Sequence, residues 1–168
     1  MYNNILSFIE MTRMGGQVKR YHCIRTVVQD SIASHSFGVA MFILALSPSP
    51  RGELIKAGLF HDLAEQVTGD SPAIAKWNHH PLYVALGEME TEFNKKWEID
   101  VELSEEEMLV LAYADVLDLC YFCLEEIAMG NRNIRPVFKA GLKRIKSLPY
   151  LESAERFVRK LEVDGYGI

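Results

Sequence analysis

The sequence predicts an all-α protein with about six or seven helices. Apolar residues recur at three- and four-residue spacing along most of the chain, and Gly and Pro breaks separate these segments. Strand-like runs are few. The longest of them, residues 23–32, is interrupted by Arg, Gln, Asp and Ser. The helical pattern therefore outweighs the strand pattern.

Three helices are expected in the first half of the chain. The first covers residues 2–13 and ends at a Gly-Gly pair, and the second covers 35–46 and ends at a Ser-Pro-Ser-Pro run. Proline is favoured in the first turn of a helix, so a third helix is expected from Pro50 to about Val67. Residues 68–72, with the sequence Thr-Gly-Asp-Ser-Pro, are typical of a turn.

The second half of the chain supplies the remaining helices. Proline again opens an expected helix, over residues 81–97. Ser104 followed by Glu107 forms a capping box, so a long helix is expected to begin there and to stop at a Gly-Asn pair at 130–131. Two further helices are expected over residues 134–147 and 150–162.

Composition limits the class of protein. A chain of 168 residues with 49% hydrophobic content is expected to fold as one domain, residues 1–168, around its own core. It contains no apolar run of about 18 residues and no signal peptide, so a cytoplasmic protein without a membrane partner is expected. The net charge of −5 argues against binding to nucleic acid polymers, and three cysteines argue against a disulfide framework.

One expected helix carries several reactive side chains near its end. Leu54, Gly58, His61 and Glu65 share one face by helical spacing, and the first two identify it as a packed face. Asp62 lies one step round the helix, three residues before Glu65. The end of this helix is therefore expected to project an imidazole and two carboxylates towards one place.

The long helix contains a carboxylate in an apolar stripe. Asp115 lies between Tyr113-Ala114 and Val116-Leu117, and burial of an unpaired carboxylate costs several kcal/mol. Asp118 interrupts the same pattern three residues later. Asp115 alone is also consistent with an ion pair to an arginine.

His35 precedes the apolar residues of the second expected helix. A single histidine on an apolar face is more often a hydrogen-bonded core residue than a metal ligand. Two histidines and two aspartates on inward faces of three helices are better explained by a metal site. We therefore predict that His35, His61, Asp62 and Asp115 bind a divalent ion. Mixed nitrogen and oxygen ligands favour Mn²⁺, Fe²⁺, Co²⁺, Ni²⁺ or Zn²⁺ over Ca²⁺, and Mg²⁺ is also kept as a candidate.

The order of these ligands resembles the H…HD…D signature of the HD-domain phosphohydrolase superfamily. Residues 34–40 (Ser-His-Ser-Phe-Gly-Val-Ala) resemble its first motif, and residues 60–72 resemble the HD…E…TGD.P block of its 5′-deoxynucleotidase branch. The segment from Ala114-Asp115 to Gly130-Asn131 resembles the last motif of that branch. The resemblance covers roughly residues 5–145 and implies a single HD-domain helical bundle.

The resemblance also implies roles for individual residues. It implies a catalytic glutamate at Glu65, which is placed to accept or return a proton. It implies substrate contacts at Arg20 and Tyr21, the Arg-aromatic pair of the branch, and at Lys76. We further expect Asp70 to be a candidate substrate contact, and Cys23, two residues after Tyr21, to line the base pocket and set the choice of purine. Arg20 suits two phosphate oxygens, and Arg25 is a further candidate cation. Asp70 is open to two interpretations, a contact to a sugar hydroxyl or a cap of the turn.

The number of phosphates on the substrate is the main open question. The branch includes 5′-deoxynucleotidases that act on dNMPs, and it resembles small phage enzymes that convert dNTPs, notably dATP, to deoxynucleoside and triphosphate. The short chain and the basic residues Lys19, Arg20, Arg25 and Lys76 favour a dATP-preferring dNTP triphosphohydrolase, with the 5′-deoxynucleotidase as the alternative. The resemblance further implies a homo-oligomer, a dimer or a hexamer, in a bacterium or a phage-infected bacterium.

Three other interpretations are weighed. A different HD enzyme, such as a cyclic-nucleotide phosphodiesterase or a (p)ppGpp hydrolase, is disfavoured by the Arg20-Tyr21 and TGDSP elements. A non-catalytic helical nucleotide-binding protein is disfavoured because all four ligands and Glu65 are present. A zinc module on Cys120-x-x-Cys123 lacks a second cysteine pair, so these cysteines are expected to be small core residues.

Overall fold

The computed structural model describes residues 4–166, apart from the side chains of Ala73, Ile74, Trp77 and Tyr166, and over this range it is all-α. Seven helices of nine residues or more account for the predicted six or seven, and two short helices and a 3₁₀ turn join them. Their bounds are α1 Ile5–Gly16, α2 Ile32–Leu46, α3 Gly52–Phe60, α4 Glu65–Thr68, α5 Ala73–Asn78, α6 His80–Trp97, α7 Glu105–Ala128, α8 Arg135–Ser147, η1 Glu152–Ala154 and α9 Glu155–Tyr166.

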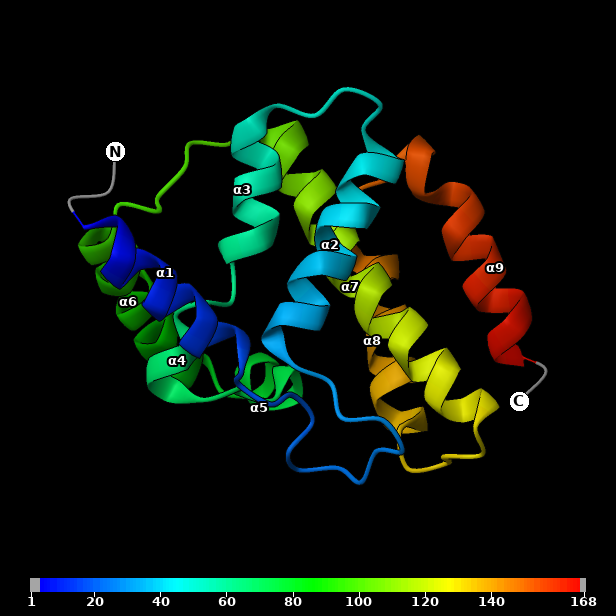
Figure 1. Ribbon diagram of the computed structural model, residues 1–168. Helices are drawn as coiled ribbons and strands as arrows, with labels where there is room; N and C mark the ends of the chain where they lie inside the picture. The colour runs from blue at the N-terminus through cyan, green and yellow to red at the C-terminus, as the bar shows by residue number, and fades with distance from the viewer. Residues whose placement is uncertain (1–3, 167–168) are drawn as a thin grey trace.

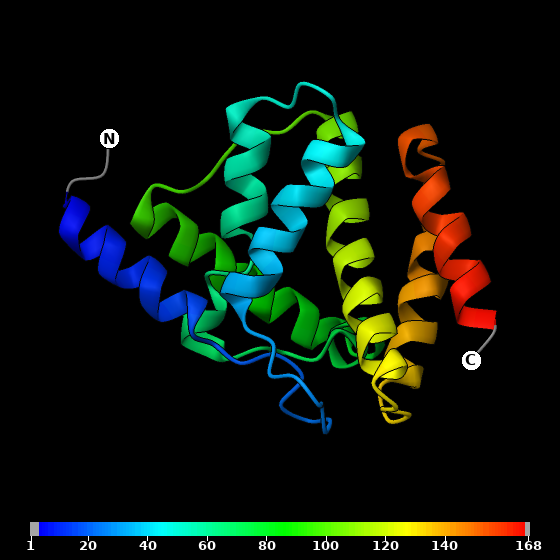
Figure 2. The same cartoon turned by 45° about the vertical axis from the view of Figure 1, so that its right-hand side comes forward.

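Helices α2 and α7 lie side by side at the centre, with α8 and α9 to one side and α1 and α6 to the other (Figures 1 and 2). The larger hydrophobic cluster joins α2, α3, α7, α8 and α9 through fully buried residues such as Ile43, Leu117 and Leu161. A smaller cluster joins α1 and α6 to the segment after α3, through Phe8, Leu63 and other residues. That segment, which contains His61 and Asp62, therefore lies where the two clusters meet.

The prediction of one helix from Pro50 to Val67 is wrong. Helix α3 ends at Phe60, a turn follows, and α4 is a separate short helix. The backbone N–H of His61 still donates to the carbonyl four residues earlier, but those of Leu63, Glu65, Gln66 and Val67 donate to carbonyls three residues earlier. This tighter winding changes the directions of successive side chains. In a continuous α-helix, adjacent residues such as His61 and Asp62 would point about 100° apart.

The remaining boundaries differ from the predictions by smaller amounts. Helix α2 begins at Ile32, three residues before the expected start, because the Ser31 hydroxyl accepts a hydrogen bond from the backbone N–H of Ser34 and caps the helix there. The predicted capping box is confirmed at the start of α7. Helix α5 was not expected, and α9 begins later than residue 150 because η1 precedes it.

No helix in the described part of the chain is long and apolar enough to cross a membrane.

Candidate metal centre and substrate cavity

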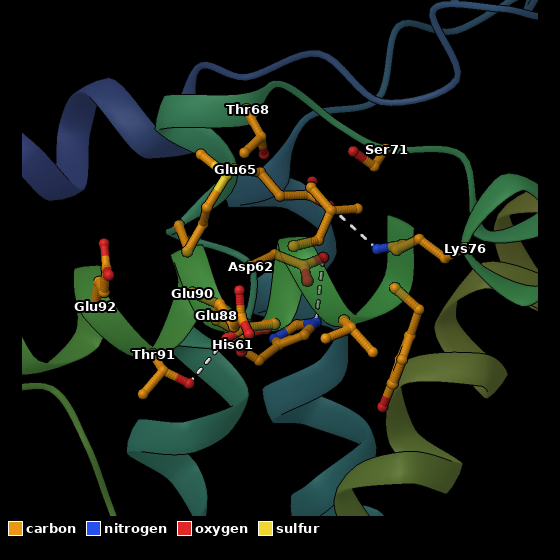
Figure 3. A pocket seen from close by; sticks show the side chains of 16 residues that line it. His61, Asp62, Glu65, Thr68, Ser71, Lys76, Glu88, Glu90, Thr91 and Glu92 are labelled. Atoms are coloured by element: carbon orange, nitrogen blue, oxygen red, sulfur yellow. Dashed lines mark hydrogen bonds and ion pairs between the residues drawn. The ribbon is translucent and has the colours of Figure 1, made fainter. Parts of the chain in front are cut away.

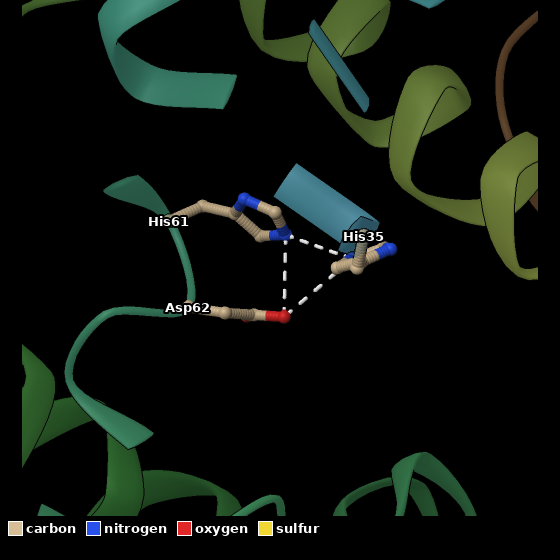
Figure 4. A group of neighbouring side chains, drawn as sticks. All are labelled: His35, His61 and Asp62. Carbon is tan, nitrogen blue, oxygen red and sulfur yellow. Dashed lines mark hydrogen bonds and ion pairs between the residues drawn. The ribbon is translucent and has the colours of Figure 1, made fainter. Parts of the chain in front are cut away.

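His35, His61 and Asp62 bring their ligand atoms together at the junction of the two hydrophobic clusters (Figure 4). The Nε2 atoms of the two histidines are 3.1 Å apart. Asp62 Oδ2 lies 3.5 Å from Nε2 of His35 and 3.3 Å from Nε2 of His61. Nitrogen and oxygen atoms converging in this way form a set that can hold a divalent ion.

Asp115 joins this group from α7, so that three elements supply the four predicted ligands. Its Oδ1 lies 3.2 Å from His35 Nε2. The His35 side chain is fully buried, whereas 44% of the Asp115 side chain is exposed. The set of His35, His61, Asp62 and Asp115, called here the His–Asp cluster, is therefore closed at the His35 end and open to solvent on the side of Asp115.

Hydrogen bonds at the far ring nitrogens fix both imidazoles. His61 Nδ1 donates to the Gly58 carbonyl oxygen at 3.0 Å, and His35 Nδ1 donates to Asp118 Oδ2 at 2.7 Å. Because both partners are acceptors, each Nδ1 carries its proton, and in the neutral rings both Nε2 atoms present lone pairs to each other. Two lone pairs and two carboxylates at this distance are stabilised by a positive charge between them, which a proton on His61 supplies without a metal and which a divalent ion can replace. The residues present therefore fit a divalent metal.

The ionisation of the cluster leads to the same conclusion. Burial alone would lower the pKa of His61, but the charge of Asp62 and a hydrogen bond to it outweigh burial and raise that pKa to about 9. Burial would raise the pKa of Asp62, but His61 and His35 hold it well below its usual range. The carboxylates thus stay ionised, and the cluster attracts a cation.

Glu65 lies one turn beyond the cluster and is nearly buried. Burial raises its pKa to about 7, the charge of Asp62 adds to the rise, and Lys76 opposes it. Lys76 Nζ donates to Glu65 Oε1 at 3.4 Å (Figure 3). The other oxygen, Oε2, is buried and has no hydrogen-bond partner among the described residues. A carboxyl that titrates near neutrality beside a metal site is suited to proton transfer.

A cavity of about 180 Å³, the catalytic cavity, adjoins the His–Asp cluster. Asp62, Glu65 and Asp115 line it on the side of the cluster. All five predicted substrate-binding residues also line it: Arg20, Tyr21, Cys23, Asp70 and Lys76. Residues from four separate segments of the chain therefore meet around one cavity.

Tyr21 is held in an unusual backbone conformation at this cavity. Its φ of +57° lies in the left-handed region, which is uncommon for a residue other than glycine. Its backbone N–H donates to Asp70 Oδ2 at 3.0 Å, and its ring stacks on Phe122 with centroids 4.7 Å apart. Asp70 thus fixes the loop that carries Tyr21. This contact joins two loops and is neither of the two interpretations given for Asp70 above, a sugar contact or a cap of its own turn.

Arg20 is buried, with only 7% of its surface exposed. Its Nη1 lies 3.4 Å from Asp30 Oδ2, and its guanidinium carbon is 5.2 Å from the centroid of the Tyr21 ring. Burial would lower the pKa of Arg20, but the acidic groups of Tyr21, Asp62 and Asp115 outweigh burial and raise it. The structure therefore contains a fixed positive charge facing the His–Asp cluster.

A buried anchor holds the loop that contains Tyr21 and Cys23. Glu126, at the end of α7, is fully buried and accepts hydrogen bonds of 2.7 Å from the backbone N–H groups of Val27 and Val28. Asn131 Nδ2 donates to Glu126 at 2.6 Å and to the Arg25 carbonyl oxygen at 2.8 Å. This Glu126–Asn131 anchor connects the C-terminal end of α7 to the loop that carries Tyr21 and Cys23.

A larger cavity of about 660 Å³, the outer cavity, shares Asp62, Glu65, Ser71 and Lys76 with the catalytic cavity. Its far wall is α6, which contributes the carboxylates of Glu88, Glu90 and Glu92 (Figure 3). Lys19 and Arg25, predicted as further phosphate contacts, line neither cavity. The region beyond the cluster is therefore acidic.

Known proteins resemble this chain in sequence over nearly its full length. The family described as 5′-deoxynucleotidase YfbR-like matches residues 7–164. The chain belongs to this family. The 5′-deoxynucleotidase YfbR of Photorhabdus temperata is 25% identical over 167 residues, covering 84% of this chain and 83% of that protein.

Solved structures share the fold of this YfbR-like protein. An HD-domain phosphohydrolase from Listeria innocua has a TM-score of 0.74 at 20% identity, over 98% of this chain and 90% of that one. The HD phosphohydrolase DatZ of cyanophage S-2L, solved with dA and one catalytic Zn²⁺ ion, has a TM-score of 0.69 at 17% identity, over 95% and 96% of the two chains. The predicted HD-domain bundle is confirmed.

This YfbR-like chain is accordingly a metal-dependent HD-superfamily phosphohydrolase that acts on deoxynucleotides. Membership of the family disfavours the cyclic-nucleotide and (p)ppGpp alternatives. The cysteines of the Cys-x-x-Cys pair are buried and free, and burial raises the pKa of Cys120 to about 12. Among the described residues no further His, Cys, Asp or Glu joins this pair in a group that could hold a metal, so a zinc module is not supported.

Sequence reasoning left several residues at the site without a role. Asp118 was visible as a second interruption of the apolar stripe, but nothing in the pattern paired it with His35. Glu126 and Asn131 lay within the last motif, although only the fold shows that they hold the loop that carries Tyr21 and Cys23. The carboxylates of α6 gave no signal, because they resemble an ordinary solvated helix face.

Proposed function

We propose that this chain is a 5′-deoxynucleotidase that converts dNMPs to deoxynucleosides and inorganic phosphate. The observation that carries this proposal is the distribution of charge around the site. Arg20 and Lys76 are the only Lys or Arg side chains among the described residues that line the two cavities. Beyond Lys76 the outer cavity is lined by Glu88, Glu90 and Glu92, which repel a chain of further phosphates.

The proposed reaction uses water to break the bond between phosphorus and O5′. A divalent metal held by His35, His61, Asp62 and Asp115 would lower the pKa of water and offset charge that develops at phosphorus. Arg20 and Lys76 bind and orient the phosphate oxygens. Glu65 takes a proton from the attacking water, and the same proton then passes to O5′ as the deoxynucleoside leaves.

The catalytic cavity is suited to the nucleoside part of the substrate. The ring of Tyr21 packs against the sugar or base, and its buried hydroxyl has no partner among the described residues, so it is available to a ligand. Asp70 acts by fixing the backbone of Tyr21. Cys23 lies at the edge of the cavity, where it contacts the base and contributes to base preference.

A dNTP triphosphohydrolase, the function favoured by the sequence, is the second candidate. It is supported by the size of the outer cavity, whose volume of about 660 Å³ adjoins the reacting centre and offers room for a longer phosphate chain. In that case additional cations would have to offset the α6 carboxylates.

A panel of all dNMPs and dNTPs, assayed with Mn²⁺, Co²⁺, Zn²⁺, Ni²⁺ or Mg²⁺, tests the proposal. We expect kcat/KM for the best dNMP to exceed that for the best dNTP at least about tenfold, which corresponds to about 1.4 kcal/mol in transition-state binding. Inorganic phosphate should be the product. Release of inorganic triphosphate from a dNTP with the higher kcat/KM would select the second candidate. The metal that supports the highest kcat, together with elemental analysis, identifies the ion.

We also propose that the enzyme is a homo-oligomer, a dimer or a hexamer. Helix α6 exposes Leu82, Tyr83, Val84 and Met89, the last three at the outer cavity, and exposed apolar groups of this kind are found at surfaces that associate. Light scattering coupled to gel filtration measures the mass directly, and a monomer at micromolar concentration would remove this proposal.

A further inference from the structure

Helices α8 and α9 lie side by side at one edge of the molecule (Figure 2). Residues of these two helices and Ile127 of α7 line a third cavity, which is partly open to solvent. The volume of this α8–α9 cleft is about 560 Å³. Ile127 and Phe138 are buried at its base, and the partly buried Leu142 supplies apolar surface beside the lysine side chains. Volumes of about 300–1,000 Å³ with an apolar lining and a few polar groups are typical of small-molecule sites.

The charge of the cleft is opposite to the charge of the whole chain. The chain has a net charge of −5, yet α8 has five Lys or Arg residues and no Asp or Glu. Four of the five line the cleft: Arg135, Lys139, Lys143 and Lys146. Lys146 pairs with Glu162 at 2.9 Å. Within the described part of the chain, Lys139 and Lys143 have no ion-pair partner, so their charges are available to an anion.

Arg135 provides an independent indication of a ligand. Its Nε atom is buried and has no hydrogen-bond partner among the described residues. A buried donor without a partner costs free energy, and such donors in folded proteins often mark an anion or a water that completes the site. Arg135 is also the first residue of α8, where the helix dipole disfavours a cation by about 0.3–1 kcal/mol. Neither feature contributes to folding stability, whereas both are expected of an anion site.

We propose that the α8–α9 cleft is a second binding site for a phosphorylated ligand with an apolar ring, the chemical class of the nucleotides. The cations bind the phosphate, and Leu142 together with the aliphatic parts of the lysine side chains packs against the ring. The site is separate from the catalytic cavity. Val137 and Ala140 of α8 line the catalytic cavity, whereas Phe138, Lys139 and Leu142 line the cleft, so α8 forms a wall of both.

Binding of trinitrophenyl-AMP, whose fluorescence rises in apolar surroundings, tests the site in the full-length protein. Lys139→Glu/Lys143→Glu reverses two cations of the cleft. Arg144→Glu is the matched control, because Arg144 is the neighbour of Lys143 on α8, is exposed, and does not line the cleft. We expect affinity to fall at least about tenfold in the double variant and to stay within about twofold in the control. Displacement by inorganic phosphate and by adenosine, measured separately, distinguishes the phosphate contribution from that of the ring.

The same titrations on an Arg20→Ala background remove binding at the catalytic cavity. The proposal is supported if the Arg20→Ala protein still binds trinitrophenyl-AMP saturably and this binding is lost when Lys139→Glu/Lys143→Glu is added. Equal loss in Arg144→Glu would show an effect of overall charge and would overturn it, as would wild-type affinity in the double variant or complete loss on the Arg20→Ala background. Circular dichroism checks that each variant is folded. Deoxynucleotide hydrolysis by the double variant should be unchanged in the absence of added ligand, so failure here is distinguishable from failure of the proposed function.

Discussion

At the scale of single residues, Gly38 decides whether Asp118 can reach His35. A Cβ atom at position 38 would lie 1.8 Å from Asp118 Oδ1. The absence of a side chain on α2 therefore makes room for the carboxylate that accepts the Nδ1 proton of His35 at 2.7 Å. Groups that orient a metal-binding histidine in this way strengthen metal binding.

Gly38→Ala is therefore expected to displace Asp118 and weaken metal binding roughly 10- to 100-fold. Competition with a chromogenic chelator measures the affinity. Gly52→Ala is a suitable control, because a Cβ atom there meets nothing within 4 Å. If Gly38→Ala binds metal as tightly as the control, the hydrogen bond from His35 to Asp118 does not tune the site.

Glu65 gives the enzyme a predicted dependence on pH. Burial and the charge of Asp62 raise the pKa of Glu65, the charge of Lys76 opposes this rise, and the net value is about 7. Glu65 accepts a proton only when it is ionised, so kcat/KM should fall on the acidic side as Glu65 is protonated, at a pH below about 7 because the bound metal offsets the charge of Asp62. Lys76→Gln removes the charge that favours the ionised form, and the inflection should move to higher pH.

The pH profiles of wild type and Lys76→Gln measure this shift. Loss of phosphate contacts in the variant would lower the whole profile without moving its inflection. An inflection that stays in place would therefore show that Glu65 does not control the acidic limb.

At the scale of elements, the segment after α3 shows that helical spacing of apolar residues does not by itself predict where a helix ends. Leu54, Gly58, His61 and Glu65 keep helical spacing, so the sequence predicts one helix. Tertiary contacts override that spacing. Leu63 and Ala64 pack into the cluster under α1 and α6, while α3 packs against α2 and α7. A straight helix could not place apolar residues in both hydrophobic clusters. The tighter turn also brings the side chains of His61 and Asp62 towards the same point.

The Glu126–Asn131 anchor is expected to contribute to both stability and substrate binding. Glu126→Gln replaces an acceptor with an amide that cannot accept from all three donors, so buried N–H groups lose their partner. A loss of about 2 kcal/mol in the free energy of unfolding is expected at pH 7. KM should also rise, because the anchored loop carries Tyr21 and Cys23. Glu125→Gln is the control, since Glu125 is the exposed neighbour.

The contribution of Glu126 should itself depend on pH. Burial would raise its pKa, but hydrogen bonds from Asn131, Val27 and Val28 outweigh burial and lower it. Stability that arises from a lowered carboxyl pKa is present above the usual value of about 4.3 and is lost as the pH falls through the lowered value. Urea unfolding should therefore show a smaller gap between wild type and Glu126→Gln in acid. A constant gap would contradict the assignment.

At the scale of the whole molecule, the His–Asp cluster joins α2, α7 and the turn after α3 where the two hydrophobic clusters meet. A metal there should stabilise the fold by linkage. An ion present at 100 times its dissociation constant adds about 2.7 kcal/mol. For a chain of this length that corresponds to a rise in Tm of roughly 5–10 °C.

Thermal unfolding with and without a chelator measures this rise. His61→Ala should show little or no response to added metal, because it removes one ligand from the cluster. A full rise in Tm in that variant would place the ion elsewhere in the molecule.

The sequence by itself determined the fold class, the capping box of α7 and the membership of the HD superfamily. These depend on local spacing and on short motifs, which are read without knowing what packs against them. It also predicted that His35, His61, Asp62 and Asp115 form a metal site, and the structure brings their side chains together, although their role as ligands stays a prediction. The treatment of residues 1–168 as one domain likewise stays a prediction.

Only the tertiary structure decided which groups meet across long distances in the chain. Asp118 reaches His35 over 83 residues, Asp70 fixes Tyr21 over 49, and Glu126 holds Val27 over 99. It also decided that Lys19 and Arg25 lie away from both cavities and that three carboxylates of α6 line the outer cavity, with Glu90 close enough to interact with Asp62 and His61. The physical reason is that hydrogen bonds and charges act through space, whereas periodicity describes only neighbours along one helix.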